Sequence, residues 1–181
     1  MPSDLGKRIL KGDVRAAAQM LTLIENKDPE ARAILKTIYS RTGKAHIIGV
    51  TGAAGSGKSA LIDRMTAELR RCNKKVGILT VDPTSPFSGG ALLGDRIRMR
   101  DHFLDDGVFI RSLATRGGWG GVSASIHEAV QLLDALEKEI VFIETIGVGQ
   151  DEVGVSTTAQ TVVVVLTPWM GDEIQGMKAG L

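Results

Sequence analysis

One stretch decides the fold of this chain: Gly52-Ala53-Ala54-Gly55-Ser56-Gly57-Lys58-Ser59. It matches the pattern G-x-x-x-x-G-K-[ST], in which a glycine-rich loop surrounds phosphate groups. The apolar run 46–51 predicts a short buried strand before the loop, and residues 60–65 open a predicted amphipathic helix after it. Strand, glycine loop and helix in this order are the setting that the motif requires, so the stretch predicts a phosphate-binding loop.

The residue types of this loop suit a nucleoside triphosphate. Glycines can adopt backbone angles that side chains forbid, so the loop N–H groups can point inward at the N-terminus of the following helix. Lys58 can place a positive charge on the β- and γ-phosphates, and Ser59 can offer its hydroxyl to Mg²⁺. We predict that every residue from Gly52 to Ala60 contributes to nucleotide binding, and that Lys58 is also catalytic.

Length and composition restrict the class of protein. The 181 residues suffice for one domain, or one domain with a short appendage, and a hydrophobic fraction of 43% is enough for a sizeable core. The formal net charge of +1 argues neither for nor against a nucleic-acid partner, and the single Cys72 fits a reducing compartment. The longest apolar run, 162–166, is of strand length, and the first residues do not resemble a secretion signal. We expect no membrane association and a cytoplasmic location, or the mitochondrial matrix in a eukaryote.

Residues 1–44 show helical spacing and contain no motif. Apolar residues recur at helical intervals from 5 to 24, and Gly12-Asp13 can divide this region into two helices. Asp28 as N-cap, with Pro29 in the first helical position, predicts a further helix that ends near 41–43. We expect this N-terminal helical segment to pack on the nucleotide-binding domain; an arm that binds a partner is the alternative.

From residue 45 to 181 apolar strands alternate with helices, which predicts one P-loop domain. The expected strands are 46–51, 75–81, 107–111, 140–145 and 161–166, and the expected helices are 58–71, 94–103, 122–138 and 171–180. This alternation is typical of a parallel sheet covered on both faces, with ligands at the carboxyl ends of the strands. The predicted fold class is therefore α/β: a three-layer P-loop NTPase sandwich with a mostly parallel sheet, preceded by short N-terminal helices.

Several charged residues follow the second predicted strand. Asp82 ends it beside the phosphate loop, where its carboxylate can face Mg²⁺ or merely cap the turn. Asp95 follows a glycine-containing loop and is either a helix cap or a second carboxylate for the metal. Arg96, Arg98 and Arg100 alternate along a predicted helix and share no face. We interpret them as solvated and expect no nucleic-acid partner.

Two later segments are open to more than one interpretation. The glycine-rich stretch from Ser112 to Gly121, predicted to be a loop, carries Arg116 and Trp119. Arg116 can stabilise transition-state charge as an arginine finger does, anchor an interface, or be solvated. After the last strand, Trp169 and Met170 can form a patch for a partner or cover the core.

The fourth predicted strand delivers an acid to the same end of the sheet. The apolar residues 140–143 lead to Glu144, which is the Walker B pattern and supplies a carboxylate to the metal or its water shell. Gly147, three residues later, can donate its N–H to the γ-phosphate. We predict that Glu144 is catalytic and assign no catalytic role to Gln150.

With these residues in place, the chain resembles the methylmalonyl-CoA mutase-associated GTPases of the MeaB type, also described as arginine/ornithine transport-system kinases. The resemblance runs from about Ile47 to Leu181. It depends on five blocks in order: GVTGAAGSGKSALID, VDPTSPFSGGALLGDRIRM, FIRSLATRGGWGGV, ETIGVGQ and GDEIQGMKAG.

The resemblance implies a Mg²⁺-dependent chaperone domain that binds and hydrolyses GTP. Its partner would be an adenosylcobalamin-dependent acyl-CoA mutase, which it assists in cofactor loading and protection. The resemblance further implies homodimers and three switch segments: the loop after Asp82, ETIGVGQ and 168–178, the last of which contacts the partner. The residues that it places around Mg²⁺ are Ser59, Asp82, Asp95 and Glu144.

Members of this family carry an N-K-x-D motif after the next strand, whose Asp recognises guanine, and a C-terminal dimerisation arm. The sequence ends at Leu181, before either feature, so we expect it to be C-terminally incomplete relative to the family. Guanine specificity therefore follows from the resemblance alone. The alternatives are a P-loop kinase of the transport-associated type and a non-catalytic nucleotide-binding module.

Overall fold

The computed structural model describes residues 2–83, 99, 102, 104–115, 121–145 and 151–168. In these residues five strands form one parallel sheet with the order β3-β2-β4-β1-β5. The strands are β1 (His46–Gly52), β2 (Val76–Pro83), β3 (Val108–Thr115), β4 (Ile140–Thr145) and β5 (Thr161–Val165). The helices are α1 (Pro2–Leu10), α2 (Val14–Glu25), α3 (Pro29–Ile38), α4 (Lys58–Arg71), α6 (Gly121–Ala135) and α7 (Asp151–Thr158). The predicted α/β class and all five predicted strands are confirmed.

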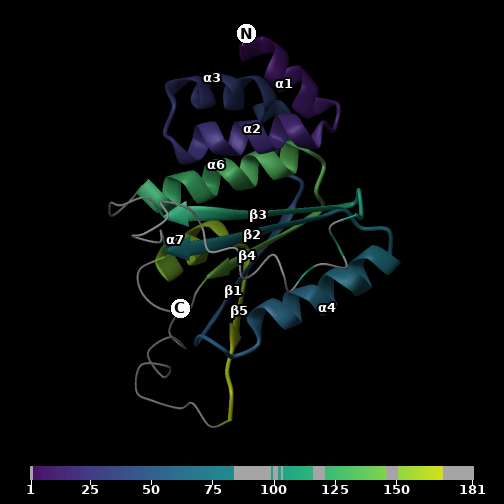
Figure 1. Ribbon diagram of the computed structural model, residues 1–181, viewed down its shortest axis with the longest axis vertical. Coiled ribbons are helices and arrows are strands. Elements are labelled where there is room, and N and C mark those ends of the chain that lie inside the picture. Colours follow the sequence, from purple (N-terminus) through teal and green to yellow (C-terminus); the bar gives the residue numbers. More distant parts are fainter. Residues whose placement is uncertain are drawn as a thin grey trace.

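Helices cover both faces of this sheet (Figure 1). Helix α4 lies on one face, where its Ile62 joins an apolar cluster with Val50 and Phe142. Helices α6 and α7 lie on the other face, and α1, α2 and α3 stack on the outer side of α6 (Figure 1). A second buried cluster runs without interruption from the N-terminal helices through α6 to the sheet. The N-terminal helices therefore share the core of the sheet, as their apolar spacing led us to expect.

Two of the N-terminal helices begin at aspartate N-caps. The Asp13 carboxylate accepts hydrogen bonds from the N–H groups of Arg15 and Ala16, at 2.9 and 3.0 Å. The Asp28 carboxylate accepts from the N–H group of Glu30 at 2.8 Å, with a proline next to it at the start of α3. These bonds satisfy N–H groups that have no partner inside the helix. The predicted break before Asp13 and the predicted helix start at Asp28 are confirmed.

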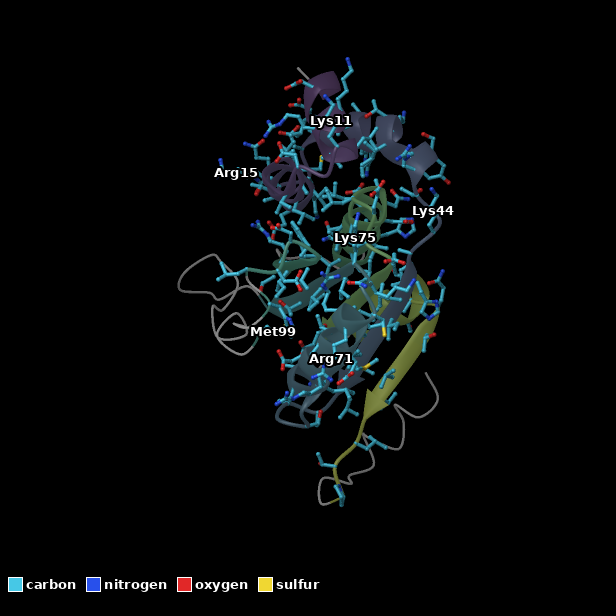
Figure 2. All side chains as sticks on the ribbon, turned by 90° about the vertical axis from the view of Figure 1, so that its right-hand side faces the viewer. Lys11, Arg15, Lys44, Arg71, Lys75 and Met99 are labelled. Carbon is cyan, nitrogen blue, oxygen red and sulfur yellow. The ribbon has the colours of Figure 1, made fainter. Side chains whose placement is uncertain are left out.

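A buried carboxylate fixes the linker between these helices and the sheet. Asp134, near the end of α6, is 6% exposed and accepts hydrogen bonds from the backbone N–H groups of Gly43, Lys44 and Ala45. Figure 2 shows Lys44 at this junction, between the N-terminal helices and the strands. One side chain of α6 therefore determines how the chain enters β1.

Some predicted boundaries were wrong. Strand β3 continues to Thr115 because residues 111–115 pair with 79–83 of β2, so the predicted loop does not begin at Ser112. Helix α7 was not predicted, and it packs closely on β1: a Cβ added at Gly49 would lie 2.5 Å from Val155 Cγ1. The predicted helix 171–180 lies outside the described residues, as does 94–103 apart from Met99 and His102.

A polar cluster holds the amino ends of the strands together. Arg70, at the end of α4, donates two hydrogen bonds of 2.8 and 2.9 Å to the Asp105 carboxylate, which lowers the pKa of Asp105. Asp105 also accepts from the N–H group of Gly107, whose carbonyl oxygen accepts from the N–H group of Val76 and from the Lys138 ammonium. Burial lowers the pKa of Lys138 to about 8. At neutral pH this cluster therefore has its full set of charges.

We expect the Asp105→Asn variant to lose about 1 kcal/mol of unfolding free energy at pH 7, as is typical of a partly exposed ion pair with good geometry. The folded-state pKa of Asp105 lies below its ordinary value of 3.8, so its stabilisation is present above that pH and is lost as the pH falls through the folded-state pKa. Urea unfolding between pH 7 and pH 3 should show the difference from wild type shrinking with acidification. A difference that stays constant would contradict this account. Asp106→Asn, next to it and exposed, is the control and should change little.

Candidate nucleotide-binding site

Strand β1 passes into α4 through a tight turn that only glycine suits at its first position. Gly52 has a φ of +141°, and a Cβ added there would collide with the carbonyl oxygen of Val165 in β5. Gly55 and Gly57 also have positive φ values, of +78° and +95°. L-residues with side chains rarely adopt these angles. The prediction that the loop needs glycine at these positions is confirmed.

Helix α4 begins without a side-chain cap. Its N-cap residue is Gly57, whereas α2 and α3 begin with Asp13 and Asp28, whose carboxylates bond the first N–H groups. The N-terminus of a helix carries a partial positive charge and favours anions. An anionic ligand can therefore take the position at α4 that a carboxylate occupies at the other two helices.

Lys58 adds a buried positive charge to this helix start. Its side chain is only 6% exposed, and its ammonium donates hydrogen bonds to the carbonyl oxygens of Gly52 and Ala53, at 2.8 and 2.9 Å. These bonds hold the ammonium over the loop rather than in solvent. Because a buried ammonium interacts strongly with nearby anions, Lys58 is placed to attract phosphate oxygens.

Ser59 and Glu144 meet beside the same loop. The Ser59 hydroxyl donates a 2.6 Å hydrogen bond to the Glu144 carboxylate, and both side chains are buried. Glu144 is delivered by β4, the immediate neighbour of β1, with Val50 as its partner in the register. Ser59, predicted from the loop motif, and Glu144, predicted from the acid at the strand end, are thus in direct contact.

A pair of threonines, which the sequence did not single out, joins the two strand ends. The Thr145 hydroxyl donates a 3.1 Å hydrogen bond to the Thr51 hydroxyl, and both side chains are buried. Thr51 precedes Gly52 and Thr145 follows Glu144. This bond therefore holds the start of the loop and the acid in a fixed relation. The sequence signal that could have predicted this pair is a threonine near the end of each of two apolar strands.

The other predicted site residues are described only in part. The Asp82 backbone lies in β2, paired with Ala114 of β3, two residues beyond the position level with Glu144. Ala54 lies in the loop and Ala60 in the first turn of α4. Asp95 and Gly147 lie outside the described residues. The further residues named from the sequence that also lie outside them are Arg116, Trp119, Gln150, Trp169 and Met170.

The oxygen donors beside the loop suit Mg²⁺. Ser59 and Glu144 present a hydroxyl and a carboxylate oxygen 2.6 Å apart, and hard oxygen donors are the ligands that Mg²⁺ prefers. Within the described residues, no three His, Cys, Asp or Glu side chains come together as a metal site. That finding is compatible with Mg²⁺, which is commonly held by one or two protein groups together with substrate phosphates.

The fold and this loop are those of the P-loop nucleoside triphosphatase class. The chain belongs to the family described as methylmalonyl Co-A mutase-associated GTPase MeaB, whose model matches residues 17–181. The family resemblance seen in the sequence is thereby confirmed.

Individual relatives agree with this assignment. A Pyrococcus horikoshii protein named "Putative GTPase" is 54% identical over 98% of this chain and 56% of its own length. The methylmalonic aciduria type A homolog, mitochondrial, of Caenorhabditis elegans is 40% identical over 98% of this chain and 48% of its own. A crystal structure described as an LAO/AO transport system kinase superposes with a TM-score of 0.68 and 26% identity, over 91% of this chain and 49% of that one. The chain thus spans about half the length of the relatives that it matches. None of the helices in the described parts of the chain has the length and apolar character needed to cross a membrane.

Two glycine substitutions distinguish the effect of the close contact at Gly52 from the effect of a positive φ. Gly52→Ala should lower the unfolding free energy by more than about 2 kcal/mol, because the new methyl group meets the Val165 carbonyl oxygen at a strained φ. Gly55→Ala is the control: it also has a positive φ but has no atom within 4 Å of the added Cβ, so about 1 kcal/mol is expected. Equal losses of unfolding free energy in the two variants, measured by chemical denaturation, would show that the contact with β5 is unimportant.

Proposed function

We propose that this chain binds GTP together with Mg²⁺ and hydrolyses it, as the nucleotide-binding part of a chaperone for an adenosylcobalamin-dependent mutase of the methylmalonyl-CoA type. The observation that supports nucleotide binding most directly is the start of α4. There a helix N-terminus without a side-chain cap, a loop of positive-φ glycines and the buried Lys58 converge. These are the features of an anion site rather than of an ordinary turn.

In this proposal the chain acts by positioning and by stabilising charge. The N–H groups from Gly52 to Ala60, with Gly147, orient the phosphates, and the Lys58 ammonium offsets the charge that develops on the transferred group. Ser59, Glu144, Asp82 and Asp95 would hold Mg²⁺, which would supply positive charge to offset that of the phosphates. As a water oxygen bonds to the γ-phosphorus, the bond from that phosphorus to the β–γ bridging oxygen breaks. The products are GDP and inorganic phosphate.

The partner and the nucleotide base are inferred from the family. The matching family model is described as mutase-associated, and the worm relative is named for methylmalonic aciduria. We infer that switch segments ordered by the γ-phosphate, including 168–178, report the nucleotide state to the mutase. A homodimer, a cytoplasmic location and the division into an N-terminal helical segment and a P-loop domain complete the proposal.

A kinase is the second candidate. The crystal structure that superposes with 26% identity and a TM-score of 0.68 is described as an LAO/AO transport system kinase. A kinase would transfer the γ-phosphoryl group to a hydroxyl or another acceptor instead of water, with the same loop and metal. Labelled γ-phosphate that ends on protein or on a small molecule supports the kinase, whereas labelled inorganic phosphate in solution supports the GTPase.

Lys58→Ala should lower GTP turnover at least about 100-fold, because a preorganised buried charge at a developing anion commonly contributes that much. The measurement is release of inorganic phosphate at saturating GTP and Mg²⁺, with chemical unfolding to show that the variant is folded. Lys36→Ala, an exposed lysine of α3, is the control and should keep the wild-type rate. Equal turnover by wild type and Lys58→Ala would remove the catalytic proposal.

Titration calorimetry with GDP, GTP and ATP tests the base. We expect the guanine nucleotides to bind with micromolar affinity in the presence of Mg²⁺ and, as the family assignment implies, ATP to bind at least about tenfold more weakly. Equal affinity for all three would indicate recognition of the phosphates alone. Absence of binding would contradict both the GTPase and the kinase.

A further inference from the structure

Two buried hydroxyl oxygens at the carboxyl end of the sheet have no hydrogen-bond partner among the described residues. They are Ser56 Oγ, inside the loop, and Thr167 Oγ1, two residues after the end of β5. A buried hydroxyl without a partner destabilises a protein, so each such group calls for an explanation. Both lie at the carboxyl end of the sheet, where ligands of this fold bind.

The Ser56 hydroxyl lies on the side of Gly52 that faces β5. A Cβ added at Gly52 would be 3.1 Å from Ser56 Oγ and would also collide with the carbonyl oxygen of Val165, the last residue of β5. The loop hydroxyl and the end of β5 therefore border the same small space. Thr167 follows Val165 by two residues, and its hydroxyl oxygen is buried.

Ser56 stands between two residues that allow its peptide to turn. Gly55 and Gly57 flank it, both with positive φ, and an added Cβ at either position would have no atom within 4 Å. The backbone angles at these glycines are not restricted by side chains, so a rotation there could re-aim the Ser56 side chain, although it would strain the 3.1 Å bond from the Ser56 N–H to the Ala53 carbonyl oxygen. Filling the loop with phosphate, which draws the backbone N–H groups inward, is an event that would cause such a rotation.

We propose that Ser56 and Thr167 are positioning residues whose hydroxyls form a hydrogen bond with each other when phosphate fills the loop, tying the loop to the end of β5. A hydroxyl both donates and accepts, so the pair satisfies itself. The bond links nucleotide occupancy to the segment that begins at Pro168. This inference rests on the proposed nucleotide binding and adds the residues through which binding reaches the end of β5.

A double-mutant cycle in the presence and absence of GDP with Mg²⁺ tests the link. In chemical unfolding without nucleotide, Ser56→Ala, Thr167→Val and the double variant should be as stable as wild type or more stable, because they remove buried hydroxyls without partners. In titrations with GDP and Mg²⁺, each single variant should bind about threefold to tenfold more weakly, and the double variant no more weakly than the singles. Thr167→Ser keeps the hydroxyl and should keep the wild-type affinity.

The control is Thr66→Val, which removes a buried hydroxyl of α4 that likewise has no partner in the described part of the chain. It should leave GDP affinity unchanged and show no coupling with Ser56→Ala. Losses that multiply in the Ser56 and Thr167 double variant, or lower stability of the single variants without nucleotide, would overturn the link. A wild-type chain that does not bind GDP would overturn the proposed function together with the link, whereas GDP binding without coupling overturns the link alone.

Discussion

Gly52, the last residue of β1, packs directly against the carbonyl oxygen of Val165 in β5, and the rest of the site depends on this contact. Gly52 has no side chain to collide with this oxygen. The chain can therefore turn at the end of β1 while β1 and β5 remain paired as far as Gly52 and Val165. The turn then delivers the first residues of α4 back over the sheet, which buries Lys58 and Ser59. A larger residue at position 52 would push the loop away from β5 and move both side chains.

The order of the strands explains why the other polar groups lie close to this turn. Strand β4 is the neighbour of β1, so Glu144 arrives within 2.6 Å of Ser59. Strand β2 is the next one along and brings Asp82 to the same edge of the sheet. In a parallel sheet the carboxyl ends of all strands lie on one side, so the register brings the backbones of Asp82 and Glu144, 62 positions apart in the sequence, to the same end of the sheet. The bond between Thr51 and Thr145 keeps that register at the site.

The sequence predicted those parts of the molecule that local chemistry determines. The strand–loop–helix setting, the glycine positions, the Asp28 cap and the acid at the end of β4 each depend on residues close in sequence. Helix α7 was missed because 151–158 contains a glycine and several β-branched residues, which are poor helix formers. Its helix depends instead on packing of Val155 against Gly49, a contact between distant segments. The true end of β3 was missed for the same reason, since pairing with β2 extends it to Thr115.

Polar groups at the amino ends of the strands differ from those at the carboxyl ends in how they are satisfied. At the amino ends, Arg70, Asp105 and Lys138 have their hydrogen bonds made within the protein, and strand ends are tied to one another through backbone bonds such as that from Val76 to Gly107. At the carboxyl ends the protein keeps a helix without a side-chain cap and two buried hydroxyls without described partners. These features cost stability in the protein alone, and under the proposed function a bound anion would offset that cost. The amino ends of the strands thus stabilise the scaffold, and under the proposed function the carboxyl ends are where ligand binding would add the most stability.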